Sequence, residues 1–548
     1  MTFARAAALS ALTLLVAAGC GAPAARARRP GSLSAREPPA MAGGCESGEA
    51  SGASICAVAR VDAAAGVVEV ALRLDPALLP EGRREVRLAF RAGALGARYA
   101  EERVDLVDGA WSLGELADPA EVRYRVTLDA AGRGSLRRPG GFHLAGLSFL
   151  PDVLVDGAPV DLPATLRIDA GETPVWTAAG GDRRLFDAPS LRRLADEAYE
   201  IGELTVTSRD AEGTVLLVAT SSPSDPGALS TLADLLAQAV RALAARLGPP
   251  PADALLVVVH PLDGSPRAER LGTSLLVRDP GASRDVLYGP AALALGELVR
   301  FWSPGTHRSV EPWLSEGVGA YLALSAAAEL ARAPAESVAR AVLRRGSEPA
   351  GDPARLGLIA GFCLDAHLGR SGSSLGAVLR TTLARGDDEP IGAEALLEDL
   401  AAISPASASY LAALLEEGAP SLDECVERFG FGAREVSFEG WSDATLAAEV
   451  LGATELRALE LVPGLLAVTA DAEAGALEAG DVLLAVEGVR VGALEDVAWA
   501  LRASAPGERV RLAIRRRGEP LALEVELPQL GPDRREQRSY RELVPAED

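Results

Sequence analysis

The stretch LALGELVRFWSPGTHRSVEPWLSEGVGAYL, residues 293–322, contains the pattern that decides the fold of the central part of this chain. Its first half places Glu297 between the apolar runs AALAL and FW, which predicts a partly buried helix. Positions 297 and 300 share one face of such a helix, so Arg300 lies on the same face as Glu297. A second segment, WLSEG, then carries Glu316. The stretch therefore predicts a helix and a following segment that each contribute a carboxylate.

The sequence around this stretch, residues 186–440, predicts a small mixed sheet followed by a helical lobe. The runs GTVLLVATSS, ADALLVVVHP and GTSLLVRD are apolar and extended, and the helix LSTLADLLAQAVRALAARLG lies between the first two. Gly248 and three prolines end that helix. From residue 290 to about 430, Leu, Ala and Val recur at three- and four-residue spacing, which is typical of packed helices.

Residues 51–185 predict a sandwich-like β domain. GVVEVALRL and EVRYRVTLD alternate apolar and polar residues, which is typical of strands that bury one face. Turn signals such as DGA and AAGRG separate these runs. The regular succession of short strands and turns favours two packed sheets.

The C-terminal part contains the clearest pattern, AGDVLLAVEGVRVGALEDVAWALRASAPGERVRLAIRRRGEPLALEVELP, residues 479–528. Glu487 and Gly488 form a turn, residues 496–501 form a helix, and two further β runs follow. This order resembles a bacterial PDZ domain, which we place at residues 441–530. The resemblance implies that an extended peptide or protein segment binds by strand addition beside the helix.

Two flanking segments of this domain carry further predictions. Leu451, Gly452 and Ala453 precede its first strands, so we expect them to form the loop that faces a ligand's carboxylate. The final residues 531–548 are a charged tail with no core pattern.

The N-terminus predicts export and a lipid anchor. MTFARAAALSALTLLVAAGC has one arginine, a short apolar run and small residues before Cys20, which is typical of a signal peptide over residues 1–19. Its ending VAAGC resembles a bacterial lipobox, which implies lipid on Cys20. Residues 20–50 have the composition of a flexible tether. We therefore expect a membrane-anchored lipoprotein of the bacterial cell envelope that faces the periplasm; the alternative is a plain signal peptide with an incidental cysteine.

Export makes disulfides possible, and the chain has five cysteines. Cys45 and Cys56 enclose a short loop and are the better candidates for a bridge. Cys363 and Cys425 are each as well explained as buried free thiols. The net charge of −23, with no basic stripe, argues against nucleic acid as a partner.

Taken together, residues 50–530 resemble the glycyl aminopeptidase family of thermolysin-like metallopeptidases with a C-terminal PDZ domain. Four motifs carry the resemblance: LRRLADEAYEIGEL, RAERLGTSLL, EPWLSEGVGAYLALSAA and LGLIAGFCLDAHLG. The matching positions are Leu194, Asp196, Gly202, Glu269, Trp313, Ser315, Glu316, Gly317, Tyr321, Gly357, Leu364 and Asp365. The implied fold is multidomain α+β: a β-sandwich-like domain, a thermolysin-like peptidase domain and a PDZ domain.

The chain departs from the family where the chemistry is done. The resemblance implies two histidine ligands for zinc, but Gly296 and Arg300 occupy those positions. Glycine offers no ligand, and arginine is a permanent cation. Glu316 keeps the third-ligand position and Glu297 the general-base position. Arg270 replaces the histidine of the substrate-binding edge strand, and the tyrosine that steadies the intermediate is also missing, at residues 354–355.

These departures predict a non-catalytic member of the family without a cofactor, whose remaining function is peptide or protein binding. An alternative is an active metallo-aminopeptidase with an altered zinc centre of Glu297, Glu316 and His307. A structural envelope protein with a closed PDZ groove is another. We expect the other three histidines, His143, His260 and His367, to be surface or capping residues.

The resemblance also implies that Glu316 lies near Glu297 and Arg300. We therefore expect Arg300 to replace the metal as an internal cation and to bridge both carboxylates through its fork of donors. The alternative is an ion-pair cluster at the surface, in which the charges remain solvated.

Overall fold

We describe the fold from a computed structural model of the 548-residue chain. The described residues are 55–62, 65–75, 85–90, 98–100, 105–107, 110–116, 119–127, 135–138, 141–178, 184–221, 226–260, 267–278, 288–302, 311–330, 335–346, 352–384, 392–417, 422–441, 456–458, 466–468, 477–478, 481–516, 519–527 and 535–545. Within these ranges, no helix is long and apolar enough to cross a membrane. The predictions for Cys20, Cys45, His307, Leu451, Gly452 and Ala453 fall outside them.

The β domain contains two sheets built from short strands. One sheet has the order β14-β12-β1-β2-β7-β4 and the other β11-β10-β3-β6-β5. The first comprises β1 (Ile55–Asp62), β2 (Val67–Leu74), β4 (Arg98–Ala100), β7 (Ala120–Thr127), β12 (Ala164–Asp169) and β14 (Leu185–Ala188). The second comprises β3 (Glu85–Ala89), β5 (Asp105–Val107), β6 (Ala110–Glu115), β10 (Asp152–Val155) and β11 (Ala158–Pro159).

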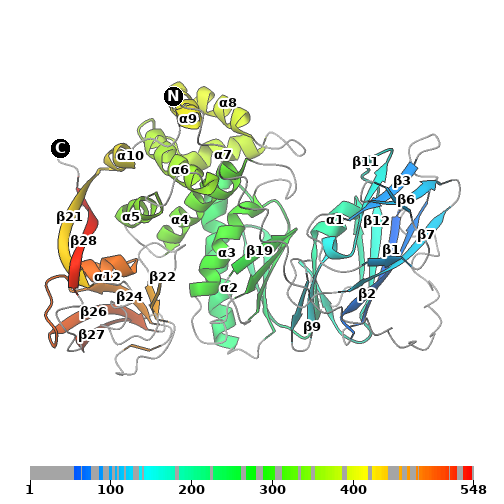
Figure 1. The fold of residues 1–548 in the computed structure, drawn as a ribbon, viewed down its shortest axis with the longest axis horizontal. Helices are drawn as coiled ribbons and strands as arrows, with labels where there is room; N and C mark the ends of the chain where they lie inside the picture. Colours follow the sequence, from blue (N-terminus) through cyan, green and yellow to red (C-terminus); the bar gives the residue numbers. More distant parts are fainter. Residues whose placement is uncertain are drawn as a thin grey trace, which may run out of the picture. The chain divides into compact units, whose positions relative to one another are not determined.

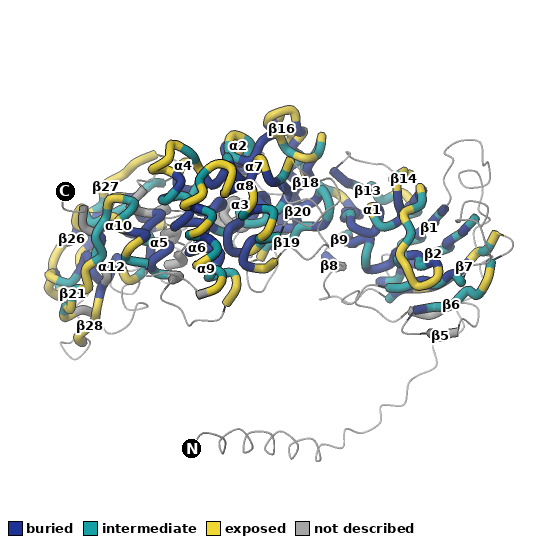
Figure 2. The backbone as a smooth tube through the Cα atoms, turned by 90° about the horizontal axis from the view of Figure 1, so that it is seen from above, coloured by how far each residue is buried: buried dark blue, intermediate teal, exposed yellow. Residues whose placement is uncertain are grey.

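The predicted alternation along these strands is confirmed. Every second residue of β2 is buried, and the antiparallel pairing of β2 with β1 and β7 places these residues in one core. The alternation can be followed along β1 and β2 in Figure 2. Tyr124 on β7 donates a hydrogen bond from its buried hydroxyl to the carbonyl of Phe149, at 2.7 Å, which satisfies the polar end of a core side chain.

A third sheet, which we call the linking sheet, is built from strands that lie in sequence among and just after those of the β domain. It has the order β13-β15-β9-β8 and comprises β8 (Ser135–Arg138), β9 (Gly141–Ala145), β13 (Val175–Trp176) and β15 (Ala198–Gly202). The 3₁₀ turn η2 (Gly146–Ser148) and the helix α1 (Leu191–Asp196) contact each other beside it. The predicted boundary at residue 185 is therefore too early, because β14 still pairs with β12 and β15 pairs with β9.

The central sheet has the order β16-β17-β18-β20-β19, and β19 is an edge strand. It comprises β16 (Thr205–Ala211), β17 (Thr214–Thr220), β18 (Ala254–His260), β19 (Arg267–Leu271) and β20 (Ser274–Arg278). The strands β17, β18 and β20 are parallel and β16 and β19 are antiparallel to their neighbours, as expected for a small mixed sheet.

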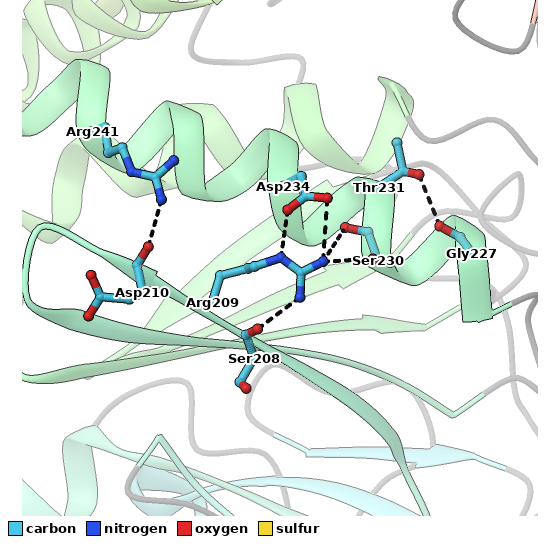
Figure 3. A network of polar contacts seen from close by, with 8 residues as sticks. All are labelled: Ser208, Arg209, Asp210, Gly227, Ser230, Thr231, Asp234 and Arg241. Atoms are coloured by element: carbon cyan, nitrogen blue, oxygen red, sulfur yellow. Dashed lines mark hydrogen bonds and ion pairs between the residues drawn. The ribbon is translucent and has the colours of Figure 1, made fainter.

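The helix α2 (Pro226–Leu247) packs on β16 and β17. Figure 3 shows the polar network that joins its first turns to β16. The guanidinium of Arg209 contacts Asp234 at 2.5 Å and the hydroxyl of Ser230 at 2.6 Å. Arg241, two turns further along, donates to the carbonyl of Asp210 at 2.7 Å. The helix is thus held to the strand by polar contacts at its rim and by apolar packing beneath.

The helical lobe shares one hydrophobic core with the central sheet. Its elements are α3 (Tyr288–Phe301), the π-helical turn η4 (Trp313–Val318), α4 (Gly319–Leu330), α5 (Ala335–Gly346), α6 (Pro353–Gly369), α7 (Leu375–Ala384), α8 (Ala393–Ile403), α9 (Pro405–Glu417) and α10 (Leu422–Arg428). Figure 1 shows α3 between β19 and α4, both of which it contacts. A disulfide joins Cys363 on α6 to Cys425 on α10, so these two are not free thiols. Cys56 is also disulfide-bonded, while its pairing with Cys45 stays a prediction.

The PDZ region contains a sheet of order β22-β23-β24-β26-β27, with β25 beside β24. Its elements are β22 (Leu456–Ala458), β23 (Leu466–Val468), β24 (Val482–Val486), β25 (Val489–Arg490), α12 (Leu494–Ala500), β26 (Arg509–Arg516) and β27 (Glu519–Glu526). The predicted turn is present: Glu487 and Gly488 both have positive φ, at 48° and 77°.

The expectation of a charged tail without a core pattern is wrong for residues 535–545. These residues form β28 (Arg535–Pro545), which pairs along its whole length with β21 (Phe431–Trp441) in a two-stranded ribbon. Tyr540 and Leu543 on β28 are buried, and Tyr540 stacks on Trp499 of α12 with the ring centres 4.8 Å apart. A strand with so few apolar residues shows no alternating pattern in the sequence. Its stability comes from pairing with β21, which the sequence of β28 alone does not reveal.

Candidate functional site

The helix α3 carries Gly296, Glu297 and Arg300. Arg300 lies one turn after Glu297, and its Nη1 is 3.0 Å from Oε1 of Glu297 and 3.4 Å from Oε2. The Arg300 side chain is 39% exposed and that of Glu297 is 16% exposed. Burial raises the pKa of Glu297 above its ordinary value, although the nearby charges of Arg300 and Arg270 act to lower it. The pair is thus at the rim of the lobe, with the carboxylate on the more buried side.

Glu316 does not join this pair in the part of the chain that the structure describes. It lies on η4, where Trp313, Leu314, Gly317 and Val318 are buried, and its own side chain is exposed. No ion pair between Arg300 and Glu316 is formed among the described residues. The expected bridge is therefore wrong in this structure, because the π-helical turn directs its apolar residues inward and leaves Glu316 on the outer side.

The turn η4 is held firmly in place by close contacts. Gly317 lies so near α6 that a Cβ there would come within 2.4 Å of the carbonyl oxygen of Ala354. A Cβ on Gly357 would come within 1.6 Å of the carbonyl oxygen of Trp313. Glu311, just before η4, accepts hydrogen bonds from the indole of Trp313 and from the backbone N–H of Ala393. The two glycines allow the backbones to touch, which fixes the position of Glu316.

Two further residues of the resembling motifs also meet. The hydroxyl of Tyr321 on α4 donates to Asp365 on α6 at 2.5 Å, and Asp365 also accepts the backbone N–H of Leu375 at 2.8 Å. Asp365 therefore ties α4, α6 and the start of α7 together. Both residues are matching positions of the family resemblance, but their contact was not predicted from the sequence.

The edge strand β19 lies against α3 and carries Glu269 and Arg270. Burial lowers the pKa of Arg270 to about 10, with the carboxylate of Glu297 opposing this shift and the guanidinium of Arg300 adding to it. Two guanidiniums, Arg270 and Arg300, thus influence the carboxylate in the general-base position. Arg300 also lines a mostly apolar pocket of about 50 Å³.

The donor set around Glu297 does not fit a zinc ion. Gly296 has no side-chain donor, and Arg300 carries a positive charge that would repel the metal. Across the described ranges, no three His, Cys, Asp or Glu side chains are grouped so that they could hold a metal ion. His307, the third member of the alternative centre, lies outside those ranges.

The histidines are placed differently from expectation. His143 and His260 were expected at the surface or in caps, but both are fully buried against Glu200. His367 is half-buried, stacks on Tyr410 and contacts the hydroxyl of Ser407 at 3.0 Å. The signal that could have found the buried pair was the continuous apolar run before His260, because a strand buried on both faces also buries its last residue.

In the PDZ region, β22 forms the edge of the sheet to which a strand could be added. The helix α12 is anchored by Asp496, which is 1% exposed. Asp496 accepts hydrogen bonds from the hydroxyl of Tyr540 at 2.8 Å, from Arg344 on α5 at 2.9 Å and from the backbone N–H of Gly492 at 2.8 Å. The ribbon and α5 thus both hold the helix α12 in place.

Comparisons with known proteins agree with this architecture. Residues 467–527 match the family model of the PDZ domain. An aminopeptidase N family protein from Idiomarina loihiensis has a similar structure, with a TM-score of 0.58 and 16% sequence identity over 88% of this chain and 98% of that chain. No curated protein matches the chain by sequence.

Two other solved structures are similar at lower scores. An M1 zinc metallopeptidase from Deinococcus radiodurans gives a TM-score of 0.47 and 17% identity over 67% of this chain and 93% of that chain. Leukotriene A4 hydrolase from Saccharomyces cerevisiae gives a TM-score of 0.46 and 12% sequence identity over 66% of this chain and 66% of that chain. The predicted fold class is confirmed: the chain is multidomain α+β, with an aminopeptidase-like architecture and a C-terminal PDZ domain.

Proposed function

We propose that this chain is a catalytically inactive peptidase homologue of the cell envelope that binds peptides or proteins through its PDZ domain. The observation that carries the proposal is the ion pair between Arg300 and Glu297 on α3. Zinc peptidases of this architecture use two imidazoles on one helical face, as the family resemblance implies. Here one position has no side chain, and the other holds a cation whose partner is the carboxylate that would act as general base.

The assignment within the aminopeptidase-like fold is to the glycyl aminopeptidase family, as a degenerate member. It is supported by the four motifs, two of which meet in the contacts of Tyr321 with Asp365 and of Gly317 with Gly357. These contacts preserve the frame around η4, while the metal-binding side chains are absent from α3. A fold that keeps the packing around η4 but lacks the zinc ligands suits a protein that binds other proteins or peptides without cleaving them.

The binding function belongs to the PDZ domain. A ligand strand would pair with the free edge of β22 and lie beside α12, so that backbone hydrogen bonds supply affinity and side-chain pockets supply specificity. Cys20 would carry the lipid that keeps the protein at the membrane. The expected fractionation result is that Cys20→Ser moves the protein from the membrane fraction to the soluble fraction.

A peptide-library selection with the complete mature chain tests this function. We expect selected peptides to slow hydrogen exchange of the β22 amides and to leave β27, the opposite edge of the same sheet, unchanged. Selection of no binder, or equal protection of both edges, would count against strand addition. Hydrolysis of the library peptides that is lost with Glu297→Gln would instead favour the active metallo-aminopeptidase with an altered centre.

A further inference from the structure

A cluster of ionisable side chains lies buried between the linking sheet and the central sheet, and none of its members belongs to the site on α3. His143 on β9 and Glu200 on β15 are direct partners in the antiparallel register of these strands. His260 ends β18 in the central sheet, and Arg138 ends β8. Glu200 and His260 are 0% exposed, His143 is 1% exposed and Arg138 is 6% exposed.

Glu200 is the centre of the cluster. Its Oε1 is hydrogen-bonded to Nδ1 of His143. Its Oε2 lies 3.4 Å from Nε2 of His260 and 3.8 Å from Nε of Arg138. The other imidazole nitrogen of His260 is 2.9 Å from the hydroxyl of Ser221, the residue that follows β17. One carboxylate therefore connects strands of two different sheets.

The cluster has an excess of positive charge. Arg278 on β20 is the register partner of His260, and it is 8% exposed. Its Nε and Nη2 have no hydrogen-bond partner in the described part of the chain, and the same holds for Nε2 of both imidazoles. The charged groups that face the imidazoles are thus Arg138, Glu200 and Arg278. With neutral imidazoles these are two cations and one anion, and each protonation adds a further cation.

The electrostatic environment favours neutral His260 and ionised Glu200. Burial lowers the pKa of His260, and the attraction of Glu200 only partly opposes this. Burial alone would raise the pKa of Glu200, but its close contacts with the two imidazoles outweigh it and hold that pKa below its ordinary range. Both folded-state pKa values are depressed. The contribution of His260 and Glu200 to the stability of the folded state is therefore fully present above their unfolded-state pKa values. It is lost as the pH falls, starting near the unfolded-state pKa of histidine, about 6.5.

We propose that Glu200, His143 and His260 form a proton-operated lock, which joins the linking sheet to the central sheet at neutral pH and opens in acid, when His260 takes up a proton. Protonation of His260 would add a third buried cation to Arg138 and Arg278 around one carboxylate. Buried like charges repel strongly, because little water screens them. Once the linking sheet has separated from the central sheet, the edge strand β19, which lies against α3, would be held less firmly.

A second contact sets where the lock opens. Glu197, just before β15, accepts hydrogen bonds from the backbone N–H of Thr273 at 3.1 Å and from its hydroxyl at 2.8 Å. Burial raises the pKa of Glu197, so its contribution has the opposite sign and is retained in acid. An apolar cluster of Ala145, Ala198 and Leu271 lies in the same region. The contact between Glu197 and Thr273 therefore keeps the linking sheet attached to the central sheet at one end when the contacts of Glu200 are lost.

Hydrogen exchange of the complete mature chain tests the lock, at about one pH unit above and one below 6.5. After correction for the intrinsic pH dependence of exchange, we expect protection of β9, β15 and β18 to fall roughly tenfold in acid, because the closed arrangement loses stability as His260 takes up a proton. The PDZ strands β26 and β27 serve as the internal reference. In the double variant His143→Gln/His260→Gln, the ratio of the protection at the higher pH to that at the lower pH should approach one. His367→Gln, which changes a histidine outside the cluster, should keep the wild-type ratio.

Equal pH ratios in the wild type and the double variant would overturn the proposal, and so would an unchanged wild type. If the double variant does not fold, NMR titration of the imidazole protons in the wild-type protein decides the question. The lock requires that protonation of His260 coincides with the loss of protection. Imidazoles that stay neutral while protection falls, or become charged while it persists, would contradict it.

Discussion

The guanidinium of Arg300 contacts the carboxylate of Glu297, one turn earlier on α3, at 3.0 Å. The contact is local to the helix, and Glu316 on η4 remains exposed. Arg300, which the proposed family assignment places at a ligand position, therefore does not act as a substitute for the metal between two segments. The energetic consequence follows from the exposure of the pair.

Because the Arg300 side chain is 39% exposed, its ion pair is screened by solvent. We expect Arg300→Ala to lower the free energy of unfolding by less than about 1 kcal/mol. Urea denaturation measures this, with Arg370→Ala, an exposed arginine at the end of α6, as the control for losing a surface arginine. A loss of about 3–5 kcal/mol would show instead that the pair is buried, as a bridge between two segments requires.

The glycine at the crossing of α6 and η4 gives a sharper effect on stability. In Gly357→Ala the new Cβ would overlap the carbonyl of Trp313, and we expect a loss of about 1–3 kcal/mol from the forced backbone shift. Gly369→Ala is the matched control on the same helix, because a Cβ there meets no atom within 4 Å. That control should be neutral or slightly stabilising. Equal effects of the two changes would contradict the close contact.

Removal of the ribbon strand tests its role in the PDZ region. A chain that ends at residue 530 lacks β28 and therefore Tyr540, which stacks on Trp499 and bonds to Asp496. We expect faster hydrogen exchange of the α12 amides, because the outer side of this helix loses its cover. A chain that ends at Pro545 is the control and should match the full chain. Unchanged exchange in the shorter chain would show that β28 does not support the helix.

The disulfide between Cys363 and Cys425 closes a loop with a sequence separation of 62 residues. We expect the double variant Cys363→Ala/Cys425→Ala to lose about 2–4 kcal/mol, because the unfolded chain regains conformational freedom. The wild-type protein under reducing conditions should show a similar loss. Denaturation midpoints that do not differ between oxidised and reduced protein would contradict a stabilising bridge.

The sequence predicts those parts of the fold that rest on local patterns. The alternation in β2 gives its buried face directly, and the turn at Glu487 and Gly488 gives a hairpin of the PDZ sheet. The strand β28 could not be found in this way. Its stability comes from pairing with β21, which is far away in the sequence, and from a few aromatic contacts.

The candidate site was less accessible to prediction. The spacing of Glu297 and Arg300 on one helix gives their pairing, since that contact is local. The position of Glu316 depends on a π-helical turn, which a period of 3.6 residues does not predict. The burial of His143 and His260 against Glu200 depends on how two sheets meet. Each of these outcomes is decided by tertiary packing, and the local sequence carries a sign only for His260, in the continuous apolar run before it.

Zinc binding by the full chain decides whether the site on α3 holds a metal ion. Isothermal titration with zinc, together with elemental analysis of the purified protein, should show no stoichiometric site in the wild type. Gly296→His/Arg300→His should gain one, because two imidazoles four residues apart share a helical face and can both reach one metal ion. One zinc per wild-type chain, with binding lost in Glu316→Gln, would contradict the account and establish a metal centre in this protein.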